Sequence, residues 1–300
     1  MGSKSSKVSR QKALDEFWRR VRSRELERAV KWIDDHNIDL YDEVDSEREW
    51  DAVQWGAYLG DHNFLTAMLD IYQLRCDTHI PDTKIEKFGV SRGATPLHLA
   101  AERGNARSIE VLIKKGNADP NPINTHGYSP LHTAALKQRH KSVISLLKCK
   151  ADVNSSLKYT NNNPNQRLTF TRGSTALHLA IKLNLKRITR ILLIYGGDGK
   201  YEDDQGLTPD QAAEIGPRSF WDYYSREKEI IEMKVAFLMA TDRDVGRYSP
   251  VRQLMHNQRF DPQIFRCIFS YVPTSVDIYN HTRPKGGRGR QVGSTLGYRY

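Results

Sequence analysis

Long apolar segments and paired cysteines are missing from this sequence of 300 residues. Residues 235–240 form one of its longest apolar runs, far short of the roughly 20 residues that a membrane-spanning helix needs. The N-terminal segment also lacks the apolar core of a secretory signal. The three cysteines, Cys76, Cys149 and Cys267, lie far apart and form no Cys-x-x-Cys pair. These absences argue against a transmembrane protein, a disulfide framework and a cysteine-based zinc site, and they predict a reducing, cytoplasmic location.

Motifs of catalysis are absent as well. The sequence holds no His-Glu-x-x-His zinc motif, no glycine-rich phosphate loop and no serine nucleophile elbow. The Gly-Gly-Arg-Gly stretch at 286–289 is too basic and too isolated to be a phosphate loop. We therefore expect a protein without enzymatic activity, cofactor or metal.

Positive charge is concentrated at the two ends of the chain. Lysine and arginine number 46 against 36 aspartate and glutamate, a formal net charge of +10. Residues 1–24 hold eight basic against two acidic residues, and residues 273–300 hold five against one. Residues 25–272 are therefore formally neutral, which argues against nucleic acid as a general partner.

One short string recurs along the chain. Residues 93–104 read GATPLHLAAERG, and the same pattern returns as GYSPLHTAA at 127–135, GSTALHLAI at 173–181 and a worn GLTPDQAA at 206–213. The aligned Thr or Ser positions are spaced by 34, 46 and 33 residues, and each of the first three copies is followed by a second apolar stretch. Thr or Ser followed by Pro is a typical helix start, because the hydroxyl caps the helix and Pro needs no partner for an N–H.

This string and its period resemble the ankyrin-repeat family. The resemblance implies an all-α solenoid of helix-turn-helix units with β-hairpin loops, capped by C-terminal helices. We expect about six units over 13–230, the first and last degenerate, with insertions near 71–90 and 155–171. Each insertion should emerge on the hairpin side of the array, as part of a binding face or as a tolerated surface loop.

The remaining segments complete the expected domain organisation. Residues 1–12 should be a disordered basic N-terminus, 231–272 a helical cap or docking segment, and 273–300 a disordered basic tail.

The resemblance also implies protein recognition, by hairpin tips and by the exposed side of each first helix. Transferred residue by residue, those positions form a basic row around two apolar anchors, Tyr128 and Leu136. This arrangement favours a partner with an acidic segment, bound by a monomer. The expected partner-binding residues are Arg92, Arg103, His126, Tyr128, Leu136, Lys137, Arg172 and Lys182.

Three histidines, His98, His132 and His178, occupy the same position in successive copies. A zinc ion needs converging ligands about 2 Å away, and side chains one repeat apart cannot converge. The resemblance implies instead that each histidine bonds backbone between hairpins.

The N-terminal sequence Met-Gly-Ser-Lys-Ser-Ser matches the N-myristoylation pattern, with Gly2 as the acylated residue. One acyl chain binds membranes only marginally, so a second signal is needed. A neighbouring basic cluster supplies it through contacts with an anionic leaflet: Lys4, Lys7, Arg10 and Lys12. The alternatives are a chance match and a disordered basic arm.

Residues 262–272 have apolar side chains in one wide stripe, as in an amphipathic helix. The segment resembles the first helix of F-box-like modules, which dock onto ubiquitin-ligase adaptors. The alternative is a cap over the exposed end of the solenoid, which every repeat array needs. The sequence thus predicts a non-catalytic ankyrin-repeat adaptor, with a ubiquitin-ligase substrate receptor as the second hypothesis.

Overall fold

The computed structural model describes residues 2–41, 43–80, 93–160 and 170–241, with side chains from residue 10 to residue 232. Within these ranges the chain forms helices and no β-strand, and one isolated antiparallel bridge joins Ser156 and Thr175. The expected all-α repeat architecture is confirmed. The helices are α1 (Gly2–Arg22), α2 (Leu26–His36), α3 (Ala52–Leu59), α4 (His62–Asp70), α5 (Pro96–Arg103), α6 (Ala106–Lys114), α7 (Pro130–Leu136), α8 (His140–Lys148), α9 (Ala176–Lys182), α10 (Lys186–Ile194), α11 (Pro209–Ile215) and α12 (Arg218–Thr241).

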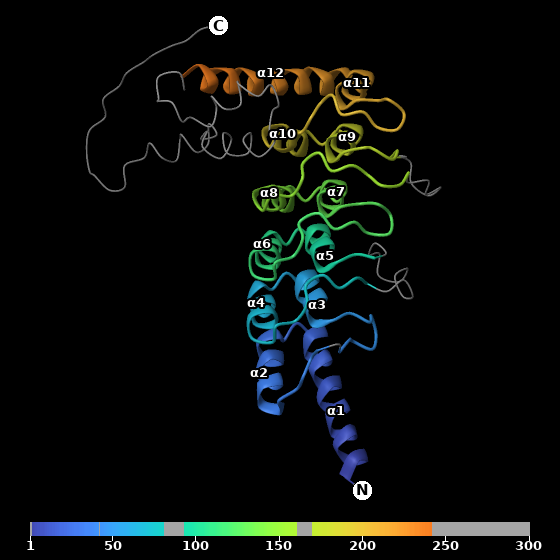
Figure 1. Cartoon of the computed structure of the whole chain (residues 1–300), viewed down its shortest axis with the longest axis vertical. Coiled ribbons are helices and arrows are strands. Elements are labelled where there is room, and N and C mark those ends of the chain that lie inside the picture. The colour runs from blue at the N-terminus through green and yellow to red at the C-terminus, as the bar shows by residue number, and fades with distance from the viewer. Residues whose placement is uncertain (1, 42, 81–92, 161–169, 242–300) are drawn as a thin grey trace, which may run out of the picture.

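The helices stack in two layers along one elongated body (Figure 1). The first helices of successive pairs, α3, α5, α7, α9 and α11, pack on one another in that order, and α4, α6, α8 and α10 do the same beside them. Figure 1 shows the long loops leaving the first layer on the side away from the second. We call the layer of α4, α6, α8 and α10 the outer layer, and the loop ends the tips.

The first helices begin where the sequence predicts. Thr95, Ser129, Thr175 and Thr208 are the N-cap residues of α5, α7, α9 and α11, each in an extended conformation, and three of these helices have Pro at their start. Each cap is part of a reciprocal capping box. In α11 the partner is Gln211, whose Oε1 accepts from the N–H of Thr208 at 3.0 Å. Helix α5 ends at Gly104, whose φ of +88° is one that glycine adopts without strain.

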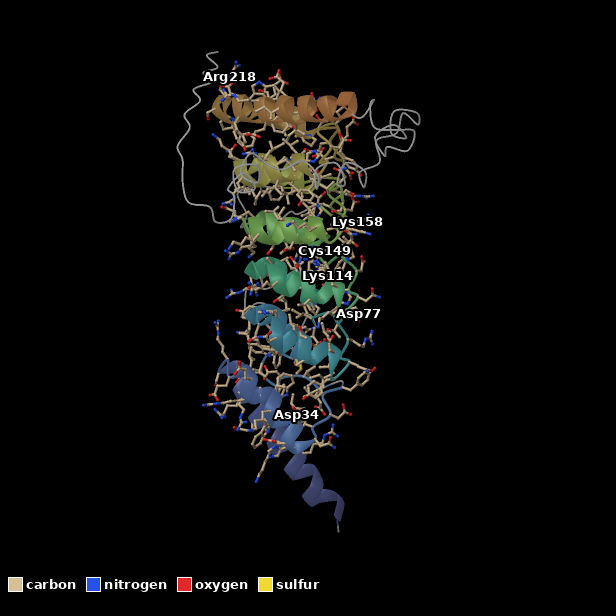
Figure 2. All side chains as sticks on the ribbon, turned by 90° about the vertical axis from the view of Figure 1, so that its left-hand side faces the viewer. Asp34, Asp77, Lys114, Cys149, Lys158 and Arg218 are labelled. Atoms are coloured by element: carbon tan, nitrogen blue, oxygen red, sulfur yellow. The ribbon has the colours of Figure 1, made fainter. Side chains whose placement is uncertain are left out.

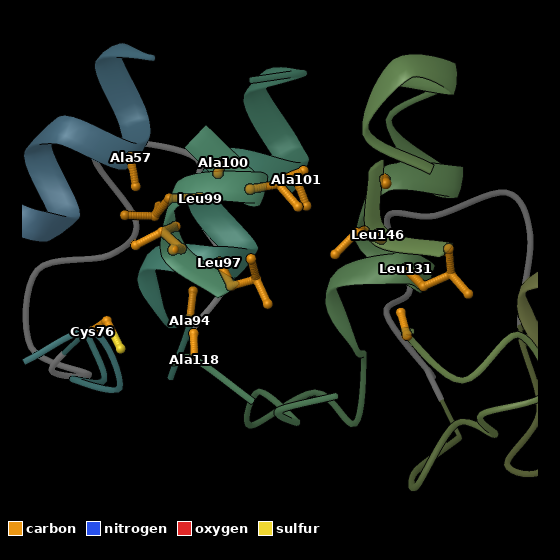
Figure 3. Close-up of a cluster of buried hydrophobic side chains, with 14 of the residues drawn as sticks. Ala57, Cys76, Ala94, Leu97, Leu99, Ala100, Ala101, Ala118, Leu131 and Leu146 are labelled. Atoms are coloured by element: carbon orange, nitrogen blue, oxygen red, sulfur yellow. The ribbon is translucent and has the colours of Figure 1, made fainter. Parts of the chain in front are cut away.

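The core lies between the two layers. Small side chains on the first helices, such as Ala100 and Ala134, are fully buried and let neighbouring helices approach closely (Figure 3). Leucines of the outer layer, including Leu112, Leu146 and Leu192, fill the space behind them and are also fully buried. Each unit therefore hides its apolar surface only against its neighbours, as in other stacked repeats.

The N-terminal end differs from the expectation of a disordered segment over 1–12, because helix α1 begins at Gly2. Its buried side chains recur with a helical period and pack against α2: Leu14, Phe17, Trp18 and Val21. The indole N–H of Trp32 in α2 also donates to the carbonyl oxygen of Ala13 at 3.0 Å. Helix formation is cooperative, so a docked second half favours helix in the first half as well.

The C-terminal end of the described chain is the long helix α12, which packs on α10 and α11. Among its side chains up to residue 232, Phe220, Tyr224 and Ile231 are buried. The phenol of Tyr224 donates to Oδ1 of Asp210 at 2.5 Å, which attaches α12 to α11. The expected boundary between array and cap at 230 is wrong, because α12 continues through it. The predicted segments 242–272 and 273–300 lie outside the described residues.

Candidate protein-binding surface

Two of the three repeated histidines, His98 and His178, connect successive units, as the resemblance implied. In His98 the ring nitrogen Nδ1 accepts from the backbone N–H of Thr95 at 3.2 Å, so the proton lies on Nε2. Nε2 then donates to the carbonyl oxygen of Tyr128, in the next unit, at 2.9 Å. His178 makes the corresponding bond to the carbonyl oxygen of Leu207 at 3.0 Å. Both ring nitrogens of these histidines are used by the fold rather than by a metal.

Burial keeps these imidazoles neutral. Desolvation lowers the pKa of His98 to about 4, against the favourable bond to the Tyr128 carbonyl. Desolvation likewise lowers the pKa of His132 to about 4 and lowers that of His178. A neutral ring with one protonated nitrogen is the form that the accepting Nδ1 and donating Nε2 require.

His132 differs from the other two histidines, and the second insertion meets the array beside it. The carbonyl oxygen equivalent to that of Tyr128 belongs to Ser174, and the backbone N–H of Leu157 donates to it at 2.9 Å. The N–H of Gly173 donates back to the carbonyl oxygen of Leu157 at 2.9 Å. Nε2 of His132 is buried without a hydrogen-bond partner in the described part of the chain. The backbone of the insertion thus meets the array at the carbonyl oxygen that corresponds to the histidine acceptors of the other units.

Tyr128 is not an exposed anchor, contrary to the sequence-based expectation. Only 7% of its surface is accessible. It packs in a small cluster with Leu157 and Phe170, from the two ends of the insertion, and with Leu179 of α9. Leu136 lies half-buried at the edge of the same cluster. The insertion therefore covers the position that the resemblance assigned to a partner.

The expected basic row is largely paired with carboxylates of the array itself. Lys137 contacts Glu102 at 2.8 Å. Arg172 contacts Asp204 at 3.5 Å, and Lys182 lies 4.0 Å from the buried Asp203. Three cations of the row are therefore balanced by carboxylates of the array.

The other expected contact residues have mixed environments. The guanidinium of Arg103 lies over the ring of Tyr58, 4.5 Å from its centroid. His126 is exposed at the tip before α7. Arg92 lies outside the described residues.

The tip of the second insertion exposes a different aromatic residue, Tyr159, with 59% of its surface accessible. Backbone contacts hold it against the preceding tip: the N–H of Lys158 donates to the carbonyl oxygen of Gly127 at 3.3 Å. On the other side, the N–H of Arg172 donates to the hydroxyl of Thr160 at 3.2 Å. We call the four exposed residues the tip surface: His126, Lys158, Tyr159 and Arg172. Sequence reasoning missed Tyr159, although it lies in an insertion expected at the tips.

The expected membrane-contact residues lie on α1. Arg10 pairs with Glu43 at 3.0 Å, and Lys12 is exposed. Gly2, Lys4 and Lys7 lie in the first turns of the helix, where side chains are not described. Among the helices of the described ranges, none combines the length and the apolar character needed to cross a bilayer.

Comparison with known proteins identifies the repeats. Residues 52–157 match the family model for three copies of the ankyrin repeat. The chain is 36% identical over 109 residues to the transient receptor potential channel pyrexia of Drosophila melanogaster, covering 36% of this chain and 10% of that protein. It is 31% identical over 110 residues to the putative ankyrin repeat protein FPV031 of fowlpox virus, covering 36% of this chain and 29% of that protein.

A longer and more distant match is the target of rapamycin complex 2 subunit AVO2 of Saccharomyces cerevisiae, 23% identical over 167 residues. It covers 56% of this chain and 34% of that protein. The chain thus spans between 10% and 34% of the length of these relatives, and the similarity concerns the repeats. Ankyrin repeats are protein-interaction modules and are generally non-catalytic. By its repeated strings, its stacked helix pairs and this match, the chain carries ankyrin repeats, and residues 52–157 contain three of them.

Proposed function

We propose that this protein is a non-catalytic adaptor that holds a segment of a partner protein on the tip surface. The observation that carries the proposal is Tyr159, whose large aromatic side chain is exposed while the residues on either side of it, Lys158 and Thr160, are bonded to neighbouring tips. Aromatic residues of this kind are typical centres of binding energy in protein interfaces, because they bury a large area at small conformational cost.

The cations around Tyr159 favour an acidic partner segment. Lys158 is exposed beside it, and Arg172 follows on the next tip. The pair between Arg172 and Asp204 is itself exposed, with 66% and 55% of the two side chains accessible. Exposed ion pairs contribute only about 0–1 kcal/mol, so a partner carboxylate can replace Asp204 at little cost. Lys137 also has an exposed side chain, although its partner Glu102 is only 13% accessible.

The test is affinity capture with quantitative mass spectrometry, comparing the wild-type chain with Tyr159→Ala. Tyr201→Ala is the matched control, because Tyr201 is also an exposed tyrosine in a loop and belongs to the next unit. We expect the main partners to be lost with Tyr159→Ala and retained with Tyr201→Ala. Equal capture by all three proteins would contradict the proposal.

A direct measurement then follows with the purified partner. Arg172→Glu should weaken its binding by about tenfold, because it removes one attraction and adds one repulsion. Unchanged binding would exclude an acidic segment at the tips while leaving the role of Tyr159 intact.

We propose in addition that Gly2 is acylated and that the lysines of the first turns assist in holding the adaptor at a membrane. This requires Gly2 to be exposed as the first residue of the mature chain. Labelling cells with an alkyne analogue of myristate should mark the wild-type chain but not Gly2→Ala. Equal partitioning of both chains into the membrane fraction would contradict the proposal that an acyl chain on Gly2 holds the protein at a membrane.

A ubiquitin-ligase substrate receptor remains the second hypothesis. It depends on residues 262–272, which lie outside the described residues. Deleting 250–272 distinguishes a docking helix from a cap. Loss of a ligase subunit with unchanged cooperativity of unfolding supports docking, whereas loss of cooperativity supports a cap.

A further inference from the structure

Charge is unevenly distributed within the formally neutral middle of the chain. Residues 25–103 contain eight lysine and arginine against seventeen aspartate and glutamate. Residues 104–200 contain sixteen against four. The second segment includes helices α6, α8 and α10, which stack directly on one another in the outer layer. Figure 2 faces this layer and shows these helices one above the other, with their side chains projecting outward.

Three of these cations occupy the same position on the three helices. Arg107, Lys141 and Arg187 are each the second residue of their helix, and all three are exposed. Desolvation lowers the pKa of His140, the first residue of α8, and the positive charges of Arg187 and Lys141 lower it further. Because stacked helices lie about 8–10 Å apart, the three cations form a row with that spacing. We call this row the outer basic strip.

The acidic side chains near the strip are engaged elsewhere. Glu110 contacts Lys114 at 3.3 Å and accepts from the hydroxyl of Ser145 at 3.3 Å. The other three carboxylates of residues 104–200 accept from nearby backbone N–H groups in loops: Asp119, Asp152 and Asp198. In the part of the chain that the structure describes, no carboxylate pairs with a cation of the strip.

The fold itself gains nothing from these three cations. They lie in the first turn of their helices, where the helix dipole favours acidic side chains and opposes basic ones. No acidic residue occupies these first turns, and no N-cap side chain bonds there. The preceding outer helix, α4, has the usual arrangement, since Asp61 accepts from the N–H groups of Asn63 and Phe64. Each of the three cations lies at a matched position that is unfavourable for helix stability. Their presence is therefore better explained by contacts with a binding partner than by a contribution to folding.

We propose that the outer basic strip is a second interaction surface, which binds an extended protein segment with an acidic residue at every third position. An extended chain advances about 3.3 Å per residue, so three residues match one step of the strip. The surface lies on the outer layer and is separate from the tip surface.

Other polyanions fit less well. The large exposed apolar residues of the described chain lie elsewhere than on α6, α8 and α10, so this face offers no side chain to insert into a lipid bilayer. Single-stranded nucleic acids bind through stacking on exposed aromatic rings together with dense phosphate contacts. The strip instead offers cations spaced by one helix, and no large aromatic side chain is exposed on α6, α8 or α10.

The experiment uses the full chain and fluorescence anisotropy in about 20 mM NaCl, where screening is weak. The first probe is a labelled peptide in which Asp alternates with Gly-Ser, and the second has the same composition with its Asp residues in one block. The test variant is Arg107→Gln/Lys141→Gln/Arg187→Gln. The control, Lys31→Gln/Lys200→Gln/Arg226→Gln, removes three exposed cations that lie outside the strip.

We expect the test variant to bind the spaced peptide about tenfold more weakly, as the loss of three exposed ion pairs implies. The control should bind it as the wild type does, and the block peptide should bind the wild type more weakly. Melting curves of both variants should match the wild type, because the side chains replaced are exposed.

Three results would overturn the proposal. Equal weakening in both variants would show a response to net charge alone. Equal affinity for the spaced peptide and the block peptide would show that the spacing of the acidic residues does not determine binding. Tighter, strip-dependent binding of a polyuridine oligonucleotide or of phosphatidylserine vesicles would assign the strip to another class of partner. Tyr159→Ala should leave binding of the spaced peptide unchanged, because Tyr159 lies on the tip surface. A failure of the strip proposal can therefore be distinguished from a failure of the proposed function.

Discussion

The Nε2–H group of His98 donates to the carbonyl oxygen of Tyr128 across 2.9 Å, and this bond joins one unit of the array to the next. His98 is almost fully buried, so its loss removes one of two donors to the carbonyl oxygen of Tyr128 and takes the acceptor from the buried N–H of Thr95. We expect His98→Leu to lower the free energy of unfolding by about 2–4 kcal/mol, measured by urea denaturation. The exposed His126 is the control, and His126→Leu should change it by about 0.5 kcal/mol or less.

His98→Gln separates the two bonds of this histidine. In α3 and α11 a glutamine in the same helical position completes the capping box, with Gln54 Oε1 accepting from Asp51 at 3.1 Å. The variant should therefore keep the cap and lose the bond to Tyr128, with an intermediate loss of stability. A loss as large as that of His98→Leu would show that the cap does not form.

The buried histidines also predict a dependence of stability on pH. His98 and His132 have a pKa of about 4 in the folded chain and about 6.5 when unfolded, so below pH 6.5 the unfolded chain binds more protons. The contribution of these two histidines to the free energy of unfolding is complete above pH 6.5 and is lost as the pH falls toward 4. The slope should be about 1.4 kcal/mol per pH unit for each histidine. His98→Leu lacks the contribution of His98, so its free energy of unfolding should fall less steeply between pH 7 and 4.5 than that of the wild type. An unchanged slope of this free energy against pH would contradict the prediction.

Tyr128 and Tyr159 should respond oppositely to truncation. Tyr128 is buried with Leu157 and Phe170, so Tyr128→Ala should lower the free energy of unfolding by about 3–5 kcal/mol. Tyr159 is exposed, so Tyr159→Ala should lower it by about 0.5 kcal/mol or less while abolishing partner binding. Chemical denaturation and partner binding on the same two proteins check both statements. If Tyr128→Ala were fully stable and lost its partner, the packing of the insertion would be wrong.

Two glycines test the contact between the insertion and the preceding tip. Gly127 has a φ of +80°, and a Cβ there would lie 2.8 Å from the backbone nitrogen of Tyr159. Gly206 has a φ of +72° and open space around it. Gly206→Ala should therefore lower stability by about 1–2 kcal/mol through backbone strain alone, and Gly127→Ala should lower it by more. Equal effects on thermal unfolding would show that the insertion does not pack against Gly127.

The sequence was sufficient to predict the repeat fold because its signals are local. A hydroxyl cap, a proline, buried alanines and the histidine of the capping box lie within a few residues of one another, as at 95–101. Helix α1 was missed because its apolar residues stabilise a helix only when α2 packs against them. The burial of Tyr128 was also missed. It depends on Leu157 and Phe170, which belong to the second insertion, where the sequence does not follow the repeat pattern.

The charge of the surface was only partly predictable. The basic row was found from its positions, but its pairing with Glu102, Asp203 and Asp204 depends on neighbours in the next tip or helix. The outer basic strip requires the register of three stacked helices. That register becomes visible only once α6, α8 and α10 are aligned in space.

The most direct test of the account is hydrogen–deuterium exchange of the full chain with and without the partner that Tyr159→Ala fails to capture. Binding at the tip surface predicts slower exchange of the amides at 124–128, 157–160 and 171–173. The amides of α6, α8 and α10 should remain unchanged when the partner has no regularly spaced acidic segment. Unchanged exchange at the three tips would contradict the central claim that this array binds its partner there.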